Sequence, residues 1–110
     1  MAKSITYLKE AYTGANFTGD AVKISDYGGP LKDGLYSAYV WGNLGGGTVT
    51  IYVSPDDGDN WFIARARDGV TDQAIFTAAD VRTVCLKGTH VSCVLTGSAG
   101  AVALNVGIAR

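Results

Sequence analysis

Three aspartates lie close together in one loop of this 110-residue chain and are its densest group of potential metal ligands. Asp56, Asp57 and Asp59 fall within four residues, and carboxylates at such spacing can bind Ca²⁺. The loop departs from the EF-hand pattern, which requires Asp-x-Asp-x-Asp-Gly and a distal Glu. A solvated acidic turn is therefore the favoured interpretation, and we expect no bound metal.

No other set of residues predicts catalysis. His90 is the only histidine, and it has no Asp or Glu near it in the sequence with which to build a catalytic triad. The chain has no Gly-x-Ser-x-Gly and no Gly-x-x-x-x-Gly-Lys, and Gly45-Gly46-Gly47 precedes an expected strand rather than a helix. We expect no enzymatic activity and no cofactor, and we expect His90 to have a turn or surface role.

The two cysteines, Cys85 and Cys93, flank the segment Lys87-Gly88-Thr89. A hairpin loop centred on Thr89 would place them opposite each other, where a cross-strand disulfide is geometrically possible. A reducing compartment instead favours two free, buried thiols, which is the preferred alternative. With a single histidine in the chain, this pair cannot complete the four ligands of a zinc site.

The segment that begins at Ser54 has the residues of a tight hairpin turn. We expect the Asp56 carboxylate to accept backbone N–H groups, Gly58 to supply a positive φ, and Trp61 to fold on the base of the hairpin. The segment resembles the Asp-box, Ser-x-Asp-x-Gly-x-Thr-Trp, of sialidases and other β-propellers, with Asn60 where Thr is usual. A sialidase needs several such boxes and an arginine cluster, so this single box implies a structural turn.

Aromatic and basic residues remain as candidates for binding. Five aromatic residues could form a sugar-binding platform, although burial in the core is favoured: Tyr36, Tyr39, Trp41, Tyr52 and Trp61. Three arginines lie in expected strands or at their ends, where they either pair with local aspartates or contact an acidic neighbouring subunit: Arg65, Arg67 and Arg82.

The elements that position these residues are predicted to be strands. Fifteen glycines and six tyrosines against two prolines favour strands joined by tight turns, and turn signals recur about every ten residues. Alternating apolar residues over 48–53 and 102–108 indicate strands buried on one face, and a single strand is expected at 60–66. The sequence predicts one domain over residues 1–110: an antiparallel β-sandwich, jelly-roll or immunoglobulin-like, of about eight strands. Residues 1–20 are either an N-terminal arm or an edge strand.

Charge and hydropathy exclude several classes of protein. Charged residues make up 17% of the chain and the net charge is −1, so neither disorder nor nucleic-acid binding is expected. No apolar run approaches the length of a membrane helix, and the N-terminus does not have the apolar region of a secretory signal. We therefore expect a protein made in the cytoplasm that does not act at a membrane.

From Gly34 onward the chain resembles small β-sandwich proteins encoded in the structural gene clusters of tailed bacteriophages. The resemblance rests on Gly-Leu-Tyr-Ser-Ala-Tyr-Val-Trp-Gly, on Gly-Gly-Thr-Val-Thr-Ile-Tyr-Val-Ser-Pro-Asp-Asp-Gly-Asp-Asn-Trp, and on the closing Val-Ala-Leu-Asn-Val-Gly-Ile-Ala-Arg. It covers about the last two-thirds of the chain. It implies a head decoration, cement or other accessory protein of the virion that binds the major capsid protein or another virion protein.

Such a protein is expected to form a homo-oligomer, for example a trimer over a lattice axis. Deleting Met1–Tyr12 is expected to weaken particle binding and to leave the sandwich folded. The competing function is a tail-associated or lectin-like carbohydrate-binding module that uses Tyr36, Tyr39 or Trp41. Exposure of the aromatic side chains distinguishes the two functions.

Overall fold

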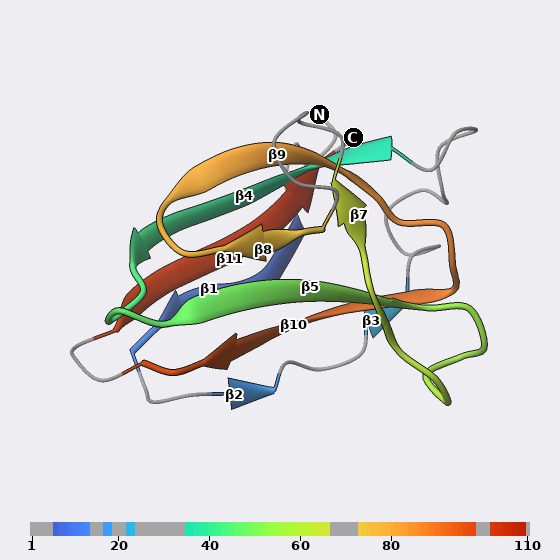
Figure 1. The fold of residues 1–110 in the computed structure, drawn as a ribbon, viewed down its shortest axis with the longest axis horizontal. Helices are drawn as coiled ribbons and strands as arrows, with labels where there is room; N and C mark the ends of the chain where they lie inside the picture. Colours follow the sequence, from blue (N-terminus) through green and yellow to red (C-terminus); the bar gives the residue numbers. More distant parts are fainter. Residues whose placement is uncertain are drawn as a thin grey trace.

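The computed structural model describes residues 6–13, 17–18, 22–23, 35–66, 73–98 and 102–109, and every structural statement below concerns these residues. They form two antiparallel β-sheets and no helix, and the sheets pack face to face as a sandwich (Figure 1). The prediction of an all-β antiparallel sandwich is confirmed.

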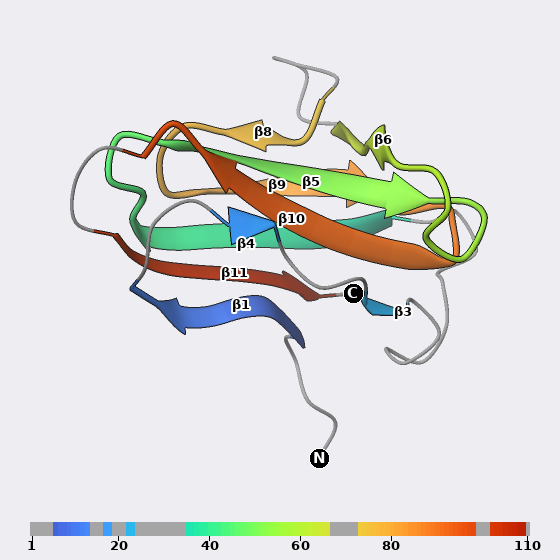
Figure 2. The same ribbon diagram turned by 90° about the horizontal axis from the view of Figure 1, so that it is seen from below.

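The first sheet has five strands and includes both the longest strand and the last one. Its order is β1 (Thr6–Tyr12), β11 (Ala103–Ala109), β4 (Leu35–Asn43), β9 (Asp80–Cys85) and β7 (Arg65–Ala66). Figure 2 shows β1, β11 and β4 lying side by side in that order.

The second sheet is built on the pair β5 (Thr48–Ser54) and β10 (His90–Thr96), which are in register along their whole length. On the edge that faces away from its partner, each of these two strands pairs with two short segments, one after the other along the strand. They are β2 (Phe17–Thr18) and β3 (Val22–Lys23) on β10, and β6 (Phe62–Ile63) and β8 (Ile75–Phe76) on β5.

The order of the strands is that of a jelly roll. If β2 with β3 and β6 with β8 are each counted as one pass, the described chain makes eight passes, and β7 is a short addition to the first sheet. Numbered along the chain, the passes run 1-8-3-6 in one sheet and 2-7-4-5 in the other, which is the arrangement of a double Greek key.

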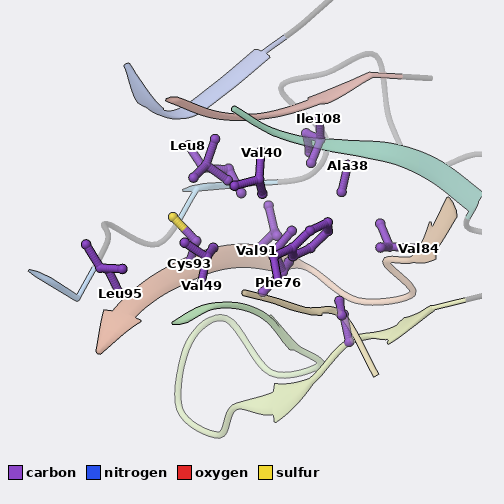
Figure 3. Close-up of a cluster of buried hydrophobic side chains, with 14 of the residues drawn as sticks. Leu8, Ala38, Val40, Val49, Phe76, Val84, Val91, Cys93, Leu95 and Ile108 are labelled. Carbon is purple, nitrogen blue, oxygen red and sulfur yellow. The ribbon is translucent and has the colours of Figure 1, made fainter. Parts of the chain in front are cut away.

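The core lies between the sheets because alternate residues of each long strand point inward. In Figure 3, Val49 of β5 and Val91 and Cys93 of β10 face Val40 of β4 and Ile108 of β11. Phe76 of β8 is the largest of the fully buried side chains. Each such aliphatic or aromatic side chain contributes roughly 1.5–3 kcal/mol by its removal from water.

The single strand expected at 60–66 is wrong, since the chain changes sheets within it. Phe62–Ile63 pairs with β5 in one sheet, whereas Arg65–Ala66 pairs with β9 in the other. Ala64, between them, is 1% exposed.

Three backbone hydrogen bonds fasten this crossing. Ile51 donates its N–H to the carbonyl of Ala74 at 3.0 Å, and the Ile51 carbonyl accepts the N–H of Ala64 at 2.9 Å. Ala74 donates to the carbonyl of Ala64 at 2.8 Å, which closes a ring of three residues. Both alanines are fully or almost fully buried, so a small side chain suits each position.

The hairpin expected between Cys85 and Cys93 is also wrong, because β9 and β10 belong to different sheets. The connection between them crosses the sandwich, with Leu86 fully buried. Both cysteines are free, and Cys93 points into the core (Figure 3). Burial raises the pKa of the Cys93 thiol to about 12, so this thiol stays protonated at neutral pH.

Residues 6–12 are an edge strand, because β1 pairs with β11 along its length and Leu8 lies in the core. The expectation that Met1–Tyr12 can be removed without loss of the fold therefore does not fit the structure. Deletion would leave the outer edge of β11 unpaired and would uncover core side chains. The expected strand at 21–25 is described only at Val22–Lys23; its other residues lie outside the described chain.

The packing at the sheet crossing predicts the effect of adding volume there. Ala74→Leu should lower the free energy of unfolding by about 1–3 kcal/mol, because Ala74 is 0% exposed and a larger side chain there must displace its neighbours. Ala78→Leu, in an exposed bend, is the control and should change it by less than about 0.5 kcal/mol. Urea unfolding of the two variants measures this, and wild-type stability of Ala74→Leu would contradict the described packing of the crossing.

Candidate functional site

The turn that follows β5 is organised by the buried side chain of Ser54, which is 0% exposed. Its hydroxyl donates to Asp56 Oδ1 at 3.0 Å and accepts the backbone N–H groups of Gly58 at 2.8 Å and of Asp56 at 3.3 Å. One hydrogen and two lone pairs are thus all used. This serine is left with no free position for a substrate.

The Asp56 carboxylate is held by Asn60 as well as by Ser54. Oδ1 accepts the backbone N–H of Asn60 at 2.9 Å, and Oδ2 accepts the Asn60 side-chain amide. The side-chain hydrogen bond from Asn60, followed by the backbone one, lowers the pKa of Asp56 below its ordinary value of 3.8. Asn60, where the Asp-box has Thr, therefore binds the same aspartate through two groups.

The backbone of the turn passes through two residues of positive φ. Asp57 has a φ of 60° and Gly58 a φ of 96°. A Cβ at Gly58 would lie 3.7 Å from Cζ2 of Trp61, so the indole packs over the glycine. The Asp57 N–H donates to Oγ1 of Thr89 at 2.9 Å.

Thr89 is a structural partner of this turn that the sequence did not indicate, since it lies 32 residues after Asp57, which it contacts. Its N–H donates to the Ser54 carbonyl at 2.8 Å, and Gly88 passes so close that a Cβ there would lie 2.5 Å from the same oxygen. Nδ1 of His90 lies 3.0 Å from Thr89 Oγ1. His90 thus contacts the residue that anchors the turn.

The acidic residues of the turn do not converge on a point. Within the described residues, no group of three or more His, Cys, Asp or Glu side chains could hold a metal ion, and the three aspartates of the turn are among the residues searched. The turn and the Gly88–Thr89 connection lie at one end of the sandwich, beyond the end of β5 (Figure 1).

The aromatic residues divide between the core and the surface. Tyr36 is 2% exposed, as expected for a core residue, but Tyr39 is 38% and Trp41 37% exposed, so the expectation of a core position is wrong for both. Tyr36, Ala38 and Val40 point inward on β4, and alternation leaves the other two to solvent. The side chains of Tyr52 and Trp61 are half-buried.

Strand register brings further apolar residues beside Tyr39 and Trp41. Tyr7, Gly107, Tyr39 and Val81 lie directly opposite one another in one row across β1, β11, β4 and β9. Val81 is 52% exposed, and the ring centroid of Tyr7 lies 5.8 Å from that of Trp41, with the ring planes tilted by 54°. We call Tyr7, Tyr39, Trp41 and Val81 the aromatic face.

The described residues beside the aromatic face are mostly polar and uncharged across the strands, whereas the ion-paired Asp80 and Arg82 flank Val81 along β9. The register places Asn105 opposite Trp41, and Ala109 and Thr83 on either side of Ser37 in the adjacent row. Tyr7 and Val81 were not identified from sequence, because only the register reveals that they share a face with β4. An exposed apolar patch of this kind is typical of a surface that binds another molecule.

The arginines have different surroundings. Arg82 donates to the carbonyl of Ile75 at 2.9 Å, pairs with Asp80 at 3.3 Å, and lies over the Phe76 ring at 5.0 Å. This is the pairing with a local aspartate that was one of the two alternatives. Arg65 is exposed on β7, and Arg67 lies outside the described residues.

No protein-family model matches this chain, and no curated protein or solved structure matches it. Within the described residues, no helix is long and apolar enough to cross a membrane.

The positive φ at Gly58 predicts a selective response to substitution. Gly58→Val should lower the free energy of unfolding by about 1–3 kcal/mol, because a β-branched residue is strained in this conformation. Gly58→Asn should cost less, since Asn tolerates the left-handed region. Urea unfolding compares the two variants, and equal losses would mean that φ is not the cause.

The lowered pKa of Asp56 predicts a pH-dependent contribution to stability. The carboxylate form favours the folded state, so this contribution is present above the unfolded-state pKa and is lost as pH falls through the lower folded-state pKa. Urea unfolding between pH 7 and pH 2 should show wild type more stable than Asp56→Asn at neutral pH. The difference should shrink in acid, and a difference that does not change with pH would contradict the assignment.

Proposed function

We propose that this protein is a non-enzymatic structural protein of a phage virion that decorates or cements the head by docking through its aromatic face. The observation that carries the proposal is the exposure of Tyr39, Trp41 and Val81 beside one another on the five-stranded sheet. The centres of protein interfaces are enriched in Tyr and Trp and depleted in charge. A partner that covers this face gains apolar burial.

Two further points support this proposal. The sequence from Gly34 onward resembles small β-sandwich proteins of phage structural gene clusters, and the jelly roll is a fold used in viral capsids, although a fold by itself does not define a function. The partner we propose is the major capsid protein or another virion protein. Assembly of the subunits as a homo-oligomer, for example a trimer, would combine several modest contacts into tight binding.

Carbohydrate binding by a tail-associated or lectin-like module is the second candidate. The observation that favours it is the contact between the half-buried Tyr7 and the exposed Trp41, with Tyr39 also open to solvent. The apolar C–H faces of sugar rings stack on such side chains.

The test is particle occupancy. Trp41→Ser and Tyr39→Ser should each weaken binding to particles that lack the protein by about thirtyfold, which is the effect of losing about 2 kcal/mol at an interface hot spot. Phe62→Ser is the matched control, because Phe62 is 59% exposed on β6 in the other sheet. Raising the salt concentration should change occupancy little, since salt screens charges.

If Trp41→Ser occupies the particles as fully as wild type does, the aromatic face is not the docking surface. If salt alone releases the protein from the particles, the contact is ionic. Retention of a neutral oligosaccharide by wild type but not by Trp41→Ser, without particle binding, would instead support the second candidate.

A further inference from the structure

The bond between Asp57 and Gly58, in the turn after β5, belongs to the sequence type in which aspartate rearranges most readily, because glycine has no side chain to hinder its backbone nitrogen. That nitrogen attacks Cγ of the aspartate, the N–Cγ bond forms, and the hydroxyl of the carboxyl group leaves with the proton of the nitrogen as water. Hydrolysis of this succinimide adds one water and gives aspartate or isoaspartate. Asp57 is exposed, so its side chain is open to this chemistry.

In the folded protein the attacking nitrogen is held by a hydrogen bond. The N–H of Gly58 donates to Oγ of Ser54 at 2.8 Å, and Ser54 is 0% exposed. The serine hydroxyl is fixed in turn, because it donates its own hydrogen to Oδ1 of Asp56 at 3.0 Å. The nitrogen of a succinimide carries no hydrogen, so the first step of the rearrangement must break the bond to Ser54.

The other side of Asp57 is anchored as well. Its N–H donates to Oγ1 of Thr89 at 2.9 Å, and the N–H and the hydroxyl of Thr89 both donate to the carbonyl of Ser54. A Cβ at Gly58 would lie 3.7 Å from Cζ2 of Trp61, so the indole covers the glycine. The peptide unit through which the ring closes is planar and moves as one body, so contacts on both sides restrain it.

We propose that Asp57 is a modification site at which isoaspartate forms, and that the Ser54 hydroxyl keeps it unmodified while the turn is folded. Isoaspartate lengthens the main chain by one carbon between the two N–H groups that bind Thr89 and Ser54. The modified turn therefore loses the spacing on which these hydrogen bonds depend, and refolding does not restore it. The proposal concerns only the turn and does not depend on the virion role.

The first test is peptide mapping of isoaspartate at Asp57 after prolonged incubation of the full chain at mildly acid pH. The folded wild type should form it at least about tenfold more slowly than the chain unfolded in guanidinium chloride, because a further hydrogen bond must break. Asp33-Gly34 and Asp68-Gly69 give the rate of the same dipeptide in the unfolded chain. Equal rates at Asp57 in the folded and the unfolded chain would overturn the proposal.

The second test removes the protecting group. Ser54→Ala deletes the acceptor of the Gly58 N–H and should raise the rate at Asp57 in the folded protein about tenfold. Thr89→Val is the matched control, because it deletes the acceptor of the Asp57 N–H and leaves Ser54 in place. Its rate at Asp57 should stay near the wild-type value. Equal acceleration in the two variants would show that a loosened turn, and not the Ser54 hydroxyl, determines the rate, and would overturn the proposal.

Amide hydrogen exchange gives a readout that needs no variant, and it decides the matter if Ser54→Ala does not fold. In folded wild type the Gly58 N–H should exchange at least about tenfold more slowly than in an unstructured peptide of the same sequence, because the bond to Ser54 must open first. Exchange at the rate of the free peptide would mean that the nitrogen is not held, and the proposal would be wrong.

Discussion

The backbone of Ile51 is the point on which the arrangement of the two sheets depends. Its N–H and its carbonyl bind two different segments, Ala74 and Ala64, which are also bonded to each other. A buried strand must have its backbone groups paired, and neither β6 nor β8 alone is long enough to pair the whole edge of β5. Two short segments, β6 and β8, pair with the edge of β5. The chain between these two segments includes β7, which pairs with β9 in the other sheet.

This crossing has consequences beyond local pairing. The buried Ala64 connects a strand of one sheet to a strand of the other, and this connection fixes the position of β7 beside β9. It also leaves the concave wall between Phe62 and Cys85. The turn at Ser54 is constrained in a similar way, because its carbonyl accepts the N–H of Thr89 from the connection that enters β10. At both places, atoms distant in sequence complete the hydrogen bonds of β5.

The features that could be predicted from the sequence are those encoded by contiguous residues. Alternation over 102–108 predicts which side chains of β11 face the core, because a strand has a period of two. The turn after Ser54 could also be located from contiguous residues, since its hydrogen-bonding residues and its glycine lie within eight positions. The features that could not be predicted depend on register between distant strands. The apolar pattern of 60–66 does not indicate that Ala64 is hydrogen-bonded to Ile51. The spacing of Cys85 and Cys93 does not indicate that the chain crosses the core at the buried Leu86.

The exposure of Tyr39 and Trp41 follows from the same register, and it has a physical advantage for binding. Gly107 lies between Tyr7 and Tyr39 in one row and is itself buried, so the residues around it cover the position where a side chain would stand. Neighbouring strands are about 4.8 Å apart, which places the backbones of Tyr7 and Tyr39 roughly 10 Å from each other across β11. Because hydrogen-bonded strands maintain this spacing before any partner arrives, a molecule that binds the aromatic face has few groups to order. Modest apolar contacts on such a rigid sheet can therefore contribute more net affinity than the same side chains on a loop.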